Sequence, residues 1–60
     1  MDQHLQNMRL AAMLDGAARL AERLHVDNGF SKGSATLTVL ELFPEFTETE
    51  IKDVNRWEFP

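Results

Sequence analysis

The stretch RLAAMLDGAARLAERLH, residues 9–25, decides the fold class of this chain. At 100° per residue its apolar side chains fall within a stripe about 120° wide, and most charged side chains lie opposite. Asp15 stands four residues before Arg19, an order that favours an ion pair on a helix. The stretch therefore predicts an amphipathic helix. Its apolar stripe consists of Leu10, Met13, Leu14, Ala17, Leu20, Ala21 and Leu24.

The two ends of this helix carry signals of different strength. Asn28-Gly29 predicts the end, because a residue there can adopt the left-handed conformation that closes a helix. The beginning is less clear: Asp2 could cap the helix, but Leu5 and Met8 project on the polar side of the stripe. Either the helix frays before residue 9, or Leu5 and Met8 contact another surface.

The segment ATLTVLELF, residues 35–43, fits two structures. Its alternating threonines suggest a strand, whereas Leu37, Leu40 and Phe43 stand at helical spacing. Ser34 is also a good helix N-cap. No other segment resembles a partner strand, and a lone strand cannot satisfy its backbone hydrogen bonds. We therefore predict a helix that ends before Pro44. The alternative is a strand paired across a symmetric dimer.

Residues 47–57, TETEIKDVNRW, predict a last helix. Thr47 and Glu50 have the spacing of a capping box, and Phe46 and Ile51 that of a hydrophobic staple. We expect the inward face to hold Ile51, Val54 and Trp57, and the outward face Glu48, Lys52, Asp53 and Arg56. The predicted fold is all-α: one long amphipathic helix, a glycine-containing loop over residues 27–34, and a short helical hairpin bent at Pro44.

The size of the chain, 60 residues with 43% hydrophobic side chains, allows one small domain spanning residues 1–60. One core in so short a chain supplies roughly 3–5 kcal/mol, and with no cysteine the chain has no disulfide to add. We therefore expect a homodimer, or a chain stabilised by a larger partner protein. The expected dimer interface follows the stripe through Leu10, Leu14, Ala17, Ala21 and Leu24.

Composition and charge exclude several functions. The net charge of −4 disfavours contact with a phosphate backbone, so nucleic-acid binding is not expected. No window approaches the ~20 apolar residues of a membrane span, and no secretory signal is evident, so we expect a cytoplasmic protein. The chain is too short to wall a substrate pocket of about 300 Å³ or more. We expect no enzymatic activity, cofactor or metal, and interpret His25, Asp27 and Ser31 as a polar turn.

Two classes of function remain. The aromatic residues all lie from Phe30 onward, and Trp57 and Phe59 stand at the very end of the sequence. Because aromatics are enriched at interface hot spots, we expect Trp57 and Phe59, together with Leu5 and Met8, to bind a partner protein; alternatively, Trp57 folds back over the first helix. The predicted function is a small non-enzymatic adaptor, inhibitor or regulator. The alternative is a helix-turn-helix DNA-binding regulator built on residues 37–56, whose last helix is acidic.

Overall fold

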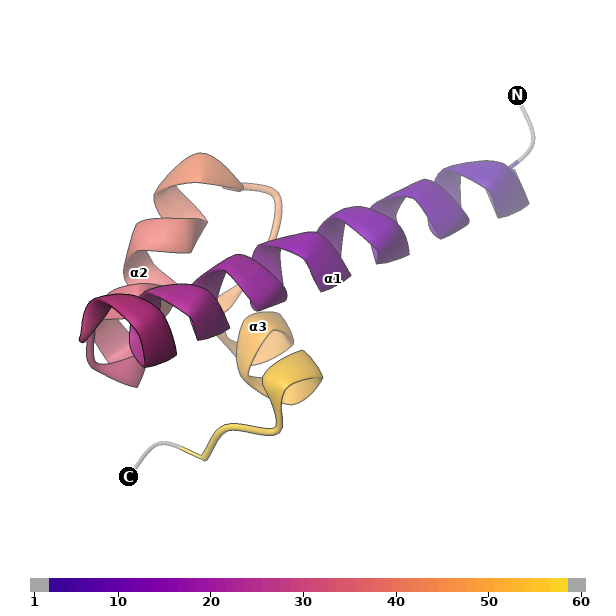
Figure 1. Ribbon diagram of the computed structural model, residues 1–60. Coiled ribbons are helices and arrows are strands. Elements are labelled where there is room, and N and C mark those ends of the chain that lie inside the picture. Colours follow the sequence, from indigo (N-terminus) through magenta and orange to yellow (C-terminus); the bar gives the residue numbers. More distant parts are fainter. Residues whose placement is uncertain (1–2, 59–60) are drawn as a thin grey trace.

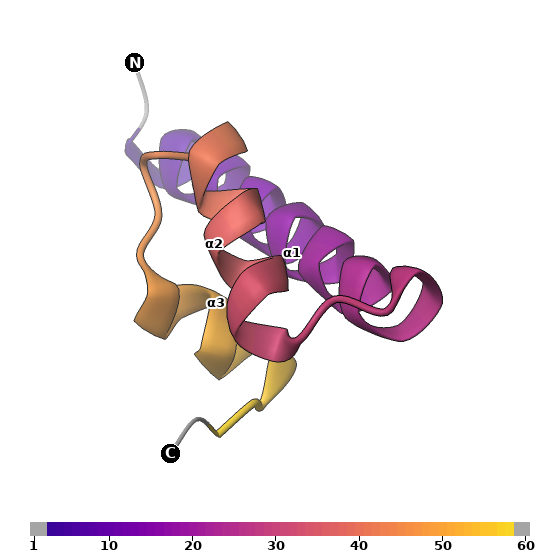
Figure 2. The same cartoon turned by 90° about the vertical axis from the view of Figure 1, so that its left-hand side faces the viewer.

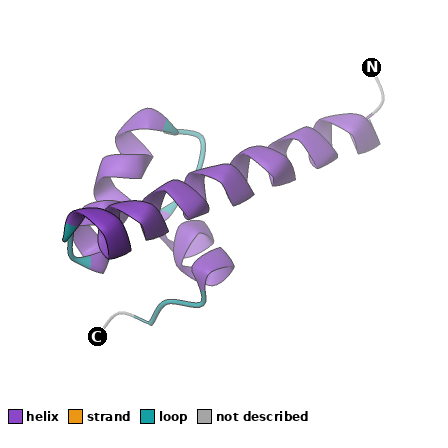
Figure 3. Ribbon diagram, viewed as in Figure 1, coloured by secondary structure: helices purple, strands orange, loops and turns teal. Residues whose placement is uncertain are grey.

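The computed structural model describes residues 3–58, so the predicted cap at Asp2 and the predicted anchor at Phe59 lie outside the described residues. The chain folds into three helices, α1 (Gln3–Asn28), α2 (Lys32–Leu42) and α3 (Glu48–Asn55), and residues 3–58 contain no strand (Figure 3). The all-α prediction is confirmed. The strand alternative for residues 35–43 is wrong, because this segment lies in α2 and its C-cap.

Helix α1 sets the shape of the molecule. Its 26 residues form a rod about 39 Å long at 1.5 Å per residue, which matches the longest extent of 41 Å, against 21 and 16 Å in the other directions. Helices α2 and α3 pack against the C-terminal half of α1, and the N-terminal half extends beyond them (Figures 1 and 2). The alternative in which the helix frays before residue 9 is therefore wrong.

The core lies where the three helices meet. Small side chains on α1 let α2 and α3 approach closely, and partly buried leucines pack around them. The predicted stripe lies on the side of α1 that faces the core. It omits Ala18, which is fully buried, and includes Leu10, which is exposed. The fully or nearly fully buried apolar residues are Ala17, Ala18, Ala21, Ala35, Val39, Phe46 and Ile51.

Helix α2 begins one turn earlier than the sequence predicts. Its N-cap is Ser31, whose hydroxyl accepts a hydrogen bond from the Ser34 backbone N–H at 3.1 Å, so the prediction of Ser34 as the cap is wrong. The hydroxyls of Thr36 and Thr38 donate to the carbonyls of Lys32 and Ser34 at 2.8 and 2.9 Å. These bonds to the preceding turn let a threonine-rich, strand-like pattern form a helix.

The beginning of α3 follows the predicted capping box. The Glu50 carboxylate accepts a hydrogen bond from the Thr47 backbone N–H at 2.9 Å, and the Thr47 hydroxyl accepts one from the Glu50 N–H at 3.3 Å. Phe46 and Ile51, the predicted staple pair, are both buried. The cap thus fixes where the chain turns from the 43–47 segment into α3.

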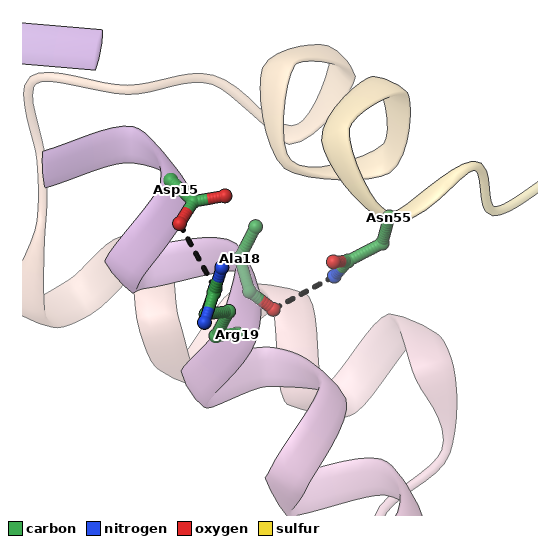
Figure 4. Close-up of polar contacts among 4 residues, drawn as sticks. All are labelled: Asp15, Ala18, Arg19 and Asn55. Atoms are coloured by element: carbon green, nitrogen blue, oxygen red, sulfur yellow. Dashed lines mark hydrogen bonds and ion pairs between the residues drawn. The ribbon is translucent and has the colours of Figure 1, made fainter. Parts of the chain in front are cut away.

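The inward face of α3 differs from the prediction. Val54 is 40% exposed, so its predicted inward position is wrong. Asn55 faces α1 instead, and its side-chain Nδ2 donates to the Ala18 carbonyl at 2.8 Å (Figure 4). A polar anchor therefore ties the end of α3 to the middle of α1. Figure 4 also shows the predicted Asp15–Arg19 ion pair, which is confirmed at 2.9 Å on the exposed side of α1.

Candidate functional site

The N-terminal part of α1 extends beyond α2 and α3 (Figure 1). Every residue from 3 to 12 is exposed, and we call this segment the overhang. Leu5 is 61% and Met8 is 55% exposed. A short helical segment without tertiary contacts has only marginal stability in water. Both side chains are exposed, and their predicted role in binding a partner stays a prediction.

The overhang has a distinct outer face. At 100° per residue, Leu5, Met8 and Ala12 fall within about 60° of one another. This face lies roughly opposite Ala17 and Ala21, the residues by which α1 contacts the core. It therefore points away from α2 and α3 and leaves an apolar stripe on the outside of the molecule.

The residues of the predicted dimer stripe differ in their burial. Ala17 and Ala21 are fully buried against the chain's own helices, and Leu14 and Leu24 are partly buried beside them. The two alanines therefore have no surface left for a second copy in this fold, and placing them in a dimer interface needs correction. Of the five predicted interface residues, Leu10 is the exposed one.

Trp57 returns to the core through a left-handed turn. Arg56 has φ 56° and ψ 37°, and its N–H bonds to the Asp53 carbonyl at 3.3 Å. The Trp57 N–H reaches back to the Lys52 carbonyl at 2.9 Å, which completes the pattern of a Schellman motif. This turn directs the indole toward the other two helices rather than along the axis of α3.

The indole of Trp57 lies at the corner where α1 passes into α2. It packs against the core and is partly buried. Its ring meets His25 edge-on at 5.6 Å between centroids, and the Lys32 Nζ lies 5.8 Å from its centroid. His25 Nδ1 in turn donates to the Phe30 carbonyl at 2.7 Å, and Gly29 supplies the positive φ of 76° at this corner.

Three exposed apolar residues were missed by the sequence analysis. Val26, Leu37 and Leu42 are all strongly exposed. Leu37 could have been found, because at helical spacing it lies opposite Ala35 and Val39, the inward residues of α2. Its exposed fraction of 59% is close to the 61% of Leu5, which makes Leu37 a useful comparison site.

Residues 3–58 contain neither a detectable pocket nor a group of three or more side chains suited to a metal ion. Within the same part of the chain, no helix is both long and apolar enough to span a membrane. Comparison with family models, curated proteins and solved structures found no match to this chain.

Proposed function

We propose that this chain is a small non-enzymatic protein-interaction module that acts in the cytoplasm as an adaptor, inhibitor or regulator. The observation that carries the proposal is the overhang, where Leu5 and Met8 are strongly exposed on the part of α1 that extends beyond α2 and α3 (Figure 1). Large apolar side chains held on a protruding helix are typical of helices that dock onto another protein.

The placement of Trp57 refines the proposal. The indole already contacts His25 and the core of its own chain, which supports a role as a lid. We therefore assign the binding surface to the overhang and give Trp57 a supporting role in the fold.

A direct test compares three forms of the full chain as bait in affinity capture from cells of its source. Met8→Glu places a charge on the overhang, and Leu37→Glu places the same charge on an equally exposed leucine of α2. We expect the wild type and Leu37→Glu to capture the same protein and Met8→Glu to lose it. Equal capture by all three forms would refute the overhang as the binding surface.

The alternative, a helix-turn-helix regulator, is less well supported. The exposed side of α3 carries Glu48 and Asp53, while Lys52 is half-buried. Acidic groups at the start of a reading helix repel DNA phosphates. Titration with bulk DNA at low salt separates the two functions: the interaction module should show no salt-dependent binding.

A further inference from the structure

We infer that the outer face of the overhang is covered by a second copy of this chain, with the two α1 helices antiparallel. The inference rests on the proposed function, since it names the partner of the same surface. It places the contact on Leu5, Met8 and Ala12, which leaves the buried alanines of α1 in the core of each copy.

The surface area of the chain supports a second copy as the occupant. A compact monomer of 6.9 kDa exposes about 4,000 Å², whereas this chain exposes 4498 Å². The excess of about 500 Å² arises because α1 protrudes from the bundle. Two overhangs pressed together would hide only the facing part of this surface, less than about 1,000 Å² in total, which is the size of a weak, concentration-dependent interface.

The charge distribution favours the antiparallel arrangement. Between residues 3 and 14 the chain holds Arg9 and no other Lys, Arg, Asp or Glu, whereas residues 31–60 have a net charge of −3. Antiparallel pairing through the overhang places the two acidic bundles at opposite ends of the dimer and keeps their repulsion low. A charge-poor contact surface is also the composition expected at an interface core.

Helical geometry sets the register. With the two-fold axis between residues 8 and 9, Leu5 of one copy lies opposite Ala12 of the other, and the two Met8 side chains meet beside the axis. The small Ala12 side chain lets the helices approach closely. The two Arg9 side chains flank the axis on one side, so the dimer should tighten as salt screens them and the net charge of −4 on each copy.

The first experiment is sedimentation equilibrium of the purified full chain between about 5 and 500 µM. We expect a monomer of 6.9 kDa to give way to twice that mass. Met8→Glu should raise the dissociation constant at least about 100-fold, since it buries an unpaired charge, and the matched control Leu37→Glu should leave it unchanged. A dimer insensitive to Met8→Glu would overturn the inferred site.

A second experiment tests the direction of the helices, and the absence of cysteine from the chain makes it clean. Met8→Cys places a thiol beside the axis, whereas Val26→Cys places it at the far end of α1, roughly 50 Å from its counterpart in the antiparallel dimer. Under mild oxidation Met8→Cys should form a disulfide-linked dimer and Val26→Cys should not. Linking of both, or of Val26→Cys alone, would overturn the antiparallel arrangement.

The two proposals fail separately. A wild-type chain that stays monomeric at every concentration refutes the second copy, yet leaves the interaction module standing if Met8→Glu still abolishes capture of another protein. Unimpaired capture by Met8→Glu refutes the overhang as the capture surface whatever the oligomeric state.

Discussion

Replacing Trp57 by alanine tests how the end of the chain is held. Complete burial of an aromatic side chain makes its truncation cost about 3–5 kcal/mol. Trp57 is partly buried, so we expect about half of this, roughly 1.5–2.5 kcal/mol, which includes the contact with the Lys32 ammonium. A core of this size supplies only roughly 3–5 kcal/mol. The substitution should therefore remove about half of the free energy of unfolding.

Urea denaturation followed by circular dichroism measures this effect without using the tryptophan as the probe. With a slope near 1 kcal/mol/M for so small a chain, the midpoint should fall by roughly 2 M. Val54→Ala is the matched control, because Val54 belongs to α3 but is exposed, and its midpoint should barely move. An unchanged midpoint for Trp57→Ala would refute the role of Trp57 as a lid over the core. Trp57 would then again be a candidate for binding a partner protein.

Three further substitutions test the ends of α3. Thr47→Ala removes the hydroxyl that accepts from the Glu50 N–H and should cost about 0.5–2 kcal/mol, whereas Thr47→Ser should retain the cap; equal midpoints for both would mean that the helix does not depend on this box. Asn55→Ala breaks the bond to the Ala18 carbonyl and should cost about 0.5–1.5 kcal/mol. Asn55→Asp has no side-chain N–H to donate and should cost at least as much. An Asn55→Asp variant as stable as the wild type would contradict a role for this hydrogen bond in stability. Arg56→Gly should raise stability by about 0.5 kcal/mol, because glycine adopts the left-handed conformation without the penalty of a side chain; a loss of stability would contradict the turn.

Local patterns in the sequence predicted most of the fold. The stripe in residues 9–25 and the capping box at Thr47 depend on neighbours within one or two turns, and the structure confirms both the helix and the box. The choice of helix over strand for residues 35–43 rested on the lack of a partner strand. It was correct, although the cap lies at Ser31 rather than Ser34.

The remaining features depend on contacts between helices, which periodicity does not encode. Ala18 is buried because α1 meets two helices at once, so its buried face is wider than a single stripe. Asn55, rather than Val54, faces α1 because its amide can reach a backbone carbonyl of that helix. Contacts between helices also explain why the predicted dimer stripe is not available as a whole. Ala17 and Ala21 are buried in the chain's own core.

The central claim is that the C-terminal half of α1 packs against α2 and α3, while the overhang packs against a second copy of the chain. Hydrogen exchange along α1, measured by mass spectrometry at about 2 and 500 µM, tests this claim most directly. Amides of residues 13–28 should be protected at both concentrations, because α2 and α3 cover this half. Amides of the overhang should exchange rapidly in the dilute sample and slow markedly in the concentrated one. Rapid exchange of the overhang at both concentrations would contradict the account.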